Sequence, residues 1–146
     1  MKKIITILAL CMAVISSSAA FAEDRGITVS INGEKLETPI AAQIVNDRTM
    51  LPMRSIFEAL GADVTWSEKN QIIFATRGAD FITLKIGSPQ LILQTTQSDE
   101  SKIIELDAAP FISDDYTLIP VRAVAEALKA QVDWEAETKT VQITDR

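Results

Sequence analysis

The chain has 146 residues, of which 47% are hydrophobic and 23% are charged, and this is the composition of one globular domain rather than of a disordered segment. Its formal net charge is −6, so attraction to the phosphate backbone of a nucleic acid is not expected. The sequence contains no His, which removes the commonest general base and the commonest copper or zinc ligand. Several classes of enzyme are therefore excluded before any motif is considered.

The first segment, residues 1–22, has the order of a secretory signal peptide. A basic pair at positions 2–3 precedes an apolar run over 4–15, and small residues then lead to an Ala-Phe-Ala sequence ending at Ala22. The apolar run is too short for a permanent membrane span, so we expect cleavage after Ala22 and export without a membrane anchor. The only cysteine, Cys11, lies inside this run, so the exported chain is expected to have no disulfide and no thiolate nucleophile.

A 28-residue stretch occurs twice in the remaining chain. Thr49–Thr76 and Thr117–Thr144 align at a constant offset of 68 without a gap, with ten identical positions. A weaker upstream match extends the copies to about 27–76 and 82–144, so residues 23–146 are predicted to be one domain made of two repeats. The repeated signature residues are Pro52, Arg54, Glu58, Leu60 and Trp66 in the first copy, and Pro120, Arg122, Glu126, Leu128 and Trp134 in the second.

Each copy is predicted to contain strands, one short helix and a β-hairpin. A strand over 27–31 ends at Asn32-Gly33, which is the strongest short hairpin signal, and a third strand is expected over 41–45. The helix is expected to begin at Pro52, because a missing N–H is tolerated in the first helical turn. Apolar residues then recur at helical spacing up to Leu60.

After each helix, apolar and polar residues alternate as in a half-buried strand. Trp66 and Trp134 lie on the apolar side of this alternation, so both indole rings are expected to pack in the core. The last strand of the first copy, 71–74, is apolar on both faces and is expected to be covered on both sides; its counterpart, 140–144, is expected at an exposed position or a sheet edge. The polar tract 94–102 is expected to be a loop at a hairpin tip.

The repeated pattern T-(hydrophobic)2-P-(hydrophobic)-R-x3-E-A-L resembles the copper amine oxidase-like N-terminal domain, also called the stalk domain, over about residues 27–144. The resemblance implies an α+β fold, in which each unit curls an antiparallel sheet around one short helix. It also implies an exported bacterial protein with an accessory, non-catalytic role. Copper chemistry is not expected, because the catalytic enzymes need His ligands and a Tyr-derived quinone, and this chain has no His and a single Tyr, Tyr116, in a turn. We therefore expect no cofactor and no metal.

The repeated Arg–Glu pairs are the first candidate for a binding site. Arg54 with Glu58, and Arg122 with Glu126, are four residues apart on a predicted helix. We interpret each pair as structural bracing, either by an ion pair or by Arg bonding to carbonyls at strand ends, rather than as a ligand site. The two tryptophans would also suit stacking on sugar rings, but their place in the alternating pattern favours core packing.

Acidic residues cluster at 99–100, 114–115 and 135–137. These clusters lack the spacing of a calcium loop, and nothing in the sequence brings two carboxylates together as a glycosidase requires. We interpret them as solvated turn residues.

The leading hypothesis is an exported, non-enzymatic module of the cell envelope that binds a wall polymer, an envelope protein or a second copy of itself. A carboxylate-based hydrolase acting on wall glycan is one alternative. The other is a secreted inhibitor or assembly factor that uses the hairpin at 94–102.

Overall fold

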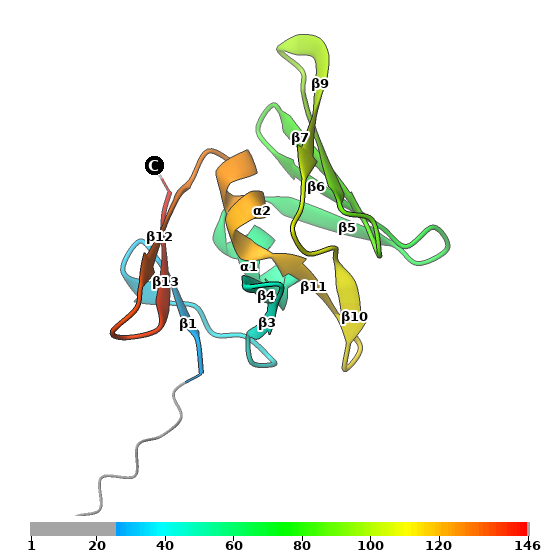
Figure 1. Ribbon diagram of the computed structural model, residues 1–146. Helices are drawn as coiled ribbons and strands as arrows, with labels where there is room; N and C mark the ends of the chain where they lie inside the picture. The colour runs from blue at the N-terminus through cyan, green and yellow to red at the C-terminus, as the bar shows by residue number, and fades with distance from the viewer. Residues whose placement is uncertain (1–25, 146) are drawn as a thin grey trace, which may run out of the picture.

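The computed structural model describes residues 26–145, in which strands form three sheets around two short helices (Figure 1). The structure is mostly β-sheet with two helices, in agreement with the predicted α+β class. The predicted signal peptide, residues 1–22, lies outside the described residues.

One sheet of four strands, sheet B, joins the two repeats at its centre. Its middle strands pair antiparallel with Leu51 opposite Ile119, and these two residues occupy matching positions of the repeat. Pro52 pairs with Leu118, and Pro120 pairs with Met50. Each proline thus lies opposite the residue two positions before the other proline, so the pairing has the symmetry of a local two-fold axis. The strand order is β10 (Phe111–Ser113), β11 (Tyr116–Pro120), β4 (Arg48–Pro52) and β3 (Gln43–Val45).

A helix follows each central strand of sheet B directly, as the proline positions predict. Helix α1 spans Met53–Ala59 and helix α2 spans Val121–Ala127. In each copy of the repeat, the chain leaves the helix through a residue in the left-handed region. This residue is Gly61 after α1, with φ 70°, and Lys129 after α2, with φ 66°. Glycine adopts this conformation without steric cost, so the first helix has the better stop signal.

The β-hairpin that follows each helix belongs to a different sheet. The first hairpin lies in sheet C, which is antiparallel and has the order β5 (Asp63–Ser67), β6 (Ile72–Arg77), β7 (Asp80–Lys85), β8 (Gln90–Thr95) and β9 (Ser98–Glu105). The second hairpin lies in sheet A, which has the order β12 (Gln131–Glu135), β13 (Thr140–Thr144), β1 (Thr28–Ile31) and β2 (Glu34–Lys35).

The prediction that each repeat curls its own antiparallel sheet around its own helix is not confirmed. Strand β1, from the first half of the chain, pairs with β13, from the second half, and this pair is parallel. Buried residues of both helices, including Phe57 of α1 and Val124 of α2, belong to one hydrophobic cluster. The two halves therefore share a single main core.

The two hairpins also meet at their last residues. Arg77 donates from Nη2 to Oδ1 of Asp145 at 2.7 Å, and these residues again occupy matching positions, 68 apart. Both side chains are mostly buried, and Nη1 of Arg77 has no hydrogen-bond partner among the described residues. The ion pair thus joins sheet C to sheet A at equivalent points of the two copies.

Three predictions about strands need correction. Strand β6 is an interior strand, but Phe74 on its outer face is 44% exposed, so the sheet is covered on one side only. For strand β13 the predicted edge position is wrong, because β1 closes its second side, whereas the predicted exposure is found on one face, at Gln142 and Thr144. The tract 94–102 forms the predicted hairpin tip, but β8 and β9 run through it and only residues 96–97 form the turn. Strand β9 is an edge strand, and its polar side chains are exposed. Its polar composition therefore does not prevent it from pairing with β8.

Candidate functional site

An open groove of about 940 Å³ lies between sheet A, helix α2 and the β3–β4 hairpin, and we call it the Trp134 groove. Its lining combines apolar and charged side chains. The apolar lining includes Ile27, Ile44, Leu106, Val121, Val132, Trp134 and Val141. These residues come from distant parts of the chain, so the groove exists only in the folded domain.

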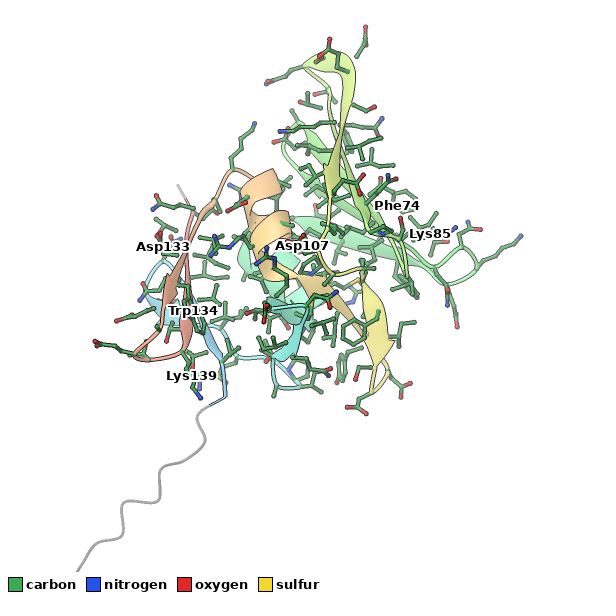
Figure 2. The ribbon with its side chains drawn as sticks, in the orientation of Figure 1. Phe74, Lys85, Asp107, Asp133, Trp134 and Lys139 are labelled. Atoms are coloured by element: carbon green, nitrogen blue, oxygen red, sulfur yellow. The ribbon has the colours of Figure 1, made fainter. Side chains whose placement is uncertain are left out.

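Trp134 on β12 is the largest side chain in this lining (Figure 2) and is 47% exposed. It is paired with Val141, which is paired in turn with Val29, and both valines are buried. Trp134 therefore lies on the same face of sheet A as these buried valines, as the alternating pattern predicts. Strand β12 is an edge strand, however, and the core ends there, so the prediction that this ring is packed in the core is wrong.

Trp66, the matching residue of the first copy, has a different environment. It is partly buried and packs against the main core cluster, as the sequence predicts. Trp66 is not part of the lining of the Trp134 groove. The same motif residue is thus structural in one copy and available to a ligand in the other.

Charged side chains of both signs also line the groove. Arg48 donates from Nε to Oδ2 of Asp107 at 2.7 Å, and its Nη2 donates to the same oxygen. Asn46 also donates from Nδ2 to the backbone oxygen of Asp107 at 2.9 Å. These bonds fix the segment after β9 against the β3–β4 turn and so hold one wall of the groove. The charged lining residues are Arg48, Arg122 and Lys139, and Asp47, Glu105, Asp107 and Glu126.

The ion pairs expected between Arg54 and Glu58, and between Arg122 and Glu126, are not found between residues 26 and 145. All four side chains are exposed, where such a pair contributes only a few tenths of a kcal/mol, and Arg preceding Glu is the weaker orientation. Arg122 and Glu126 instead line the Trp134 groove, whereas Arg54 and Glu58 lie outside it.

The remaining signature residues are buried. Leu60 and Leu128 close the ends of the helices in the main core, and Pro52 and Pro120 are buried at the helix starts. Pro120 also contributes to the lining of the groove.

Sequence analysis does not find Asp107, Ile44 or Arg48 as lining residues. The one available signal is that Arg48 differs in type from its counterpart in the second copy, Tyr116.

The groove combines side chains of several chemical types. An exposed indole, other apolar side chains and hydrogen-bonding groups of both charges can hold a ligand and fix its orientation. Within the described range, no group of three or more Asp or Glu residues is placed to hold a metal ion, and no helix there is long and apolar enough to cross a membrane.

The fold is a small α+β domain built on a repeated strand–helix–hairpin motif. A family model described as the copper amine oxidase N-terminal domain matches residues 30–144, so the chain belongs to this family, and the predicted resemblance is confirmed. The copper amine oxidase N-terminal domain is a non-catalytic module.

One relative among curated proteins is a protein of Brevibacillus choshinensis named "Protease inhibitor". It is 25% identical over 115 residues, which is 79% of this chain and 33% of the relative. The chain therefore spans about a third of the length of that protein.

Proposed function

We propose that this protein is an exported, non-catalytic binding module of the cell envelope and that the Trp134 groove is its binding site. The observation that carries the proposal is the half-exposed indole of Trp134 in an open groove, in a family whose domain is non-catalytic. Export is supported by the order of residues 1–22, and the excess of acidic residues disfavours nucleic acid as a partner.

The groove is preferred over the other exposed apolar side chains because it is concave. Exposed Phe74 and Ile103 lie on sheet C, outside the Trp134 groove, whereas Trp134 lines the groove together with other apolar side chains and hydrogen-bonding groups. Concave sites with few polar groups are where proteins bind ligands most often.

The test is cosedimentation of the exported protein with purified envelopes. The protein collected from an expressing culture should lack residues 1–22, and it should be retained by the envelopes. Trp134→Ala and Arg122→Ala should each reduce retention, whereas Arg54→Ala, at the matching position outside the groove, should not. Retention that is equal in all four proteins would contradict the proposal.

A second candidate function is inhibition of a protease through the β8–β9 hairpin. Two observations favour it: the relative carries the name "Protease inhibitor", and Ser98–Lys102 of β9 are fully on the surface. If this hypothesis holds, shortening the tip at residues 96–97 should abolish inhibition of a secreted protease while the fold and the envelope retention persist.

A carboxylate-based hydrolase remains the enzymatic alternative, since four acidic residues line the groove. One of them, Asp107, is engaged by Arg48, which favours a structural role for that carboxylate. Release of reducing sugar from purified wall, abolished by Glu126→Gln with binding intact, would establish the hydrolase and replace the proposal of a non-catalytic module.

A further inference from the structure

We infer that the ligand of the Trp134 groove is an uncharged oligosaccharide, with one sugar ring stacked on the indole of Trp134. This inference rests on the proposed function and names the chemical class of the ligand. Three observations carry it: the open indole face, the mixed charges of the lining, and the size of the groove.

The indole of Trp134 provides a flat apolar surface at the side of the groove. A sugar ring has one face of C–H groups and a periphery of hydroxyls, so it can cover an aromatic ring while its hydroxyls remain free to form hydrogen bonds. Trp134 is 47% exposed next to the buried Val132 and Val141, so the ring is presented by a packed sheet rather than by a mobile loop.

The charges of the lining suit hydroxyl groups better than they suit a charged polymer. Arg122 offers only donors and Glu126 only acceptors, and neither side chain has a hydrogen bond or ion pair within the described part of the chain. A sugar hydroxyl both donates and accepts, so one chain of hydroxyls can satisfy both side chains. The lining offers no continuous positive surface to a polyanion, because Asp47, Glu105 and Glu126 line the groove together with its cations, and the overall charge of −6 also disfavours one.

The shape of the groove favours a sugar chain over an extended peptide. The residues from sheet A that line it, including Trp134 and Val141, project from the face of the sheet. A peptide that adds to a sheet instead pairs with the backbone of a free edge, and in sheet A that edge is β12 itself; the groove presents side chains of the sheet face and not this backbone, and the peptide pool tests the alternative. The volume of about 940 Å³ lies at the upper end of the range for small-molecule sites, so it suits several linked sugar units.

The experiment is a titration of the exported protein with neutral oligosaccharides, followed by Trp fluorescence and calorimetry. The probes are tetrasaccharides of β-1,4-linked N-acetylglucosamine, β-1,4-linked glucose and α-1,4-linked glucose, together with a polyglutamate and a mixed pool of extended peptides. In Trp66→Phe, Trp134 is the only tryptophan, so a change of its emission reports directly on the groove.

We expect at least one neutral tetrasaccharide to bind and to change the emission of Trp134. Trp134→Ala should weaken binding by about tenfold or more, and Trp134→Phe should weaken it less because a smaller ring can still stack. Arg122→Ala and Glu126→Gln should each weaken binding by several fold, whereas Arg54→Ala and Ile103→Ala should not change it. Circular dichroism of each variant identifies any loss of fold, and Trp134→Phe serves as the second variant if Trp134→Ala unfolds.

Two results would overturn the inference: no neutral oligosaccharide binds, or binding is the same in Trp134→Phe, Arg122→Ala and Glu126→Gln as in the native chain. Envelopes separate these failures from a failure of the proposed function. If groove-dependent retention survives removal of glycan from the envelopes and is lost after their digestion with protease, the module binds a protein and only the inference fails. If retention does not depend on the groove at all, both fail.

Discussion

The two copies of the repeat place the same tryptophan in different surroundings. Trp66 packs against the main core, whereas Trp134 is half exposed and lines a groove. Both rings lie on the inward face of an edge strand, β5 in one sheet and β12 in another. The repeated motif thus determines on which face of its strand the tryptophan lies. The neighbouring segments determine whether that face is covered.

The two helices show a related difference. The fully buried Phe57 of α1 corresponds to Ala125 of α2, and partly buried Ser55 corresponds to Ala123, which lines the groove. The second helix therefore fills less volume beside its sheet than the first. Ala125 is fully buried outside the groove lining, so its smaller size changes the core, whereas Ala123 contributes to the groove itself.

The largest expected effect comes from removing the aromatic side chain that distinguishes α1. Phe57→Ala should lower the free energy of unfolding by about 3–5 kcal/mol, because the ring is fully buried and a cavity remains. Both halves share one core, so we expect a single unfolding transition. Urea unfolding followed by circular dichroism and by fluorescence measures both quantities.

The exposed Ala59 on the same helix provides the control, since Ala59→Ser should change stability by less than about 0.5 kcal/mol. Two separate transitions, with the second copy still folded after the first has melted, would show that the halves are independent.

The next largest effect concerns the ion pair between matching positions, Arg77 and Asp145. Asp145→Arg should cost about 2 kcal/mol, because it removes a mostly buried charged hydrogen bond and places two cations together. The exchanged pair, Arg77→Asp with Asp145→Arg, should recover most of this loss if the site is symmetric. Thermal unfolding of the three proteins makes the comparison.

Asp145→Asn is the control for this series, since it removes the charge without introducing repulsion and should lie between the native chain and Asp145→Arg. A double variant that is no more stable than Asp145→Arg alone would rule out the symmetric arrangement.

The residues that end the two helices should show a smaller effect of opposite sign. Gly61→Ala should cost about 1 kcal/mol, because φ is 70° there although the space around Gly61 is open. Lys129→Gly should stabilise the chain by up to about 1 kcal/mol, because φ is 66° at that position. Chemical denaturation of both variants measures the difference.

Lys129 also forms an ion pair with Asp80, with Nζ 3.2 Å from Oδ2, and Lys129→Gly removes it. Lys129→Gln removes the ion pair but keeps the backbone strain, so it isolates the two contributions. Destabilisation by Lys129→Gly beyond that of Lys129→Gln would contradict the argument from backbone conformation.

Much of the fold could be predicted because its signals are local. Asn32-Gly33 forms the predicted tight turn, and both turn residues have positive φ. Proline at 52 and 120 marks the start of each helix, and the alternation after each helix matches β5 and β12. Each of these features depends on a few neighbouring residues, so the sequence contains what is needed to infer it.

The sheet partners and the groove could not be predicted in the same way. The parallel pairing of β1 with β13 joins the two ends of the described chain, and the groove brings together segments near 44, 107, 122 and 134. Such contacts depend on how whole sheets pack, which no local pattern records. The alternation around Trp134 gave the right face of the strand but carried no information about what would cover it.

The smallest expected change in stability comes from conservative replacement of each tryptophan, and it tests directly whether Trp66 and Trp134 differ in exposure. Trp66→Phe leaves only Trp134, and Trp134→Phe leaves only Trp66. Trp134 should emit at longer wavelength and be quenched more strongly by acrylamide than Trp66, because its ring is 47% exposed to water while Trp66 packs on the core. Trp134→Phe should change the free energy of unfolding by less than about 1 kcal/mol, since little buried surface is lost, and Trp66→Phe should cost more. Equal quenching of the two single-tryptophan proteins would mean that the copies do not differ in this respect, and a groove open to a ligand at Trp134 would then lose its main support.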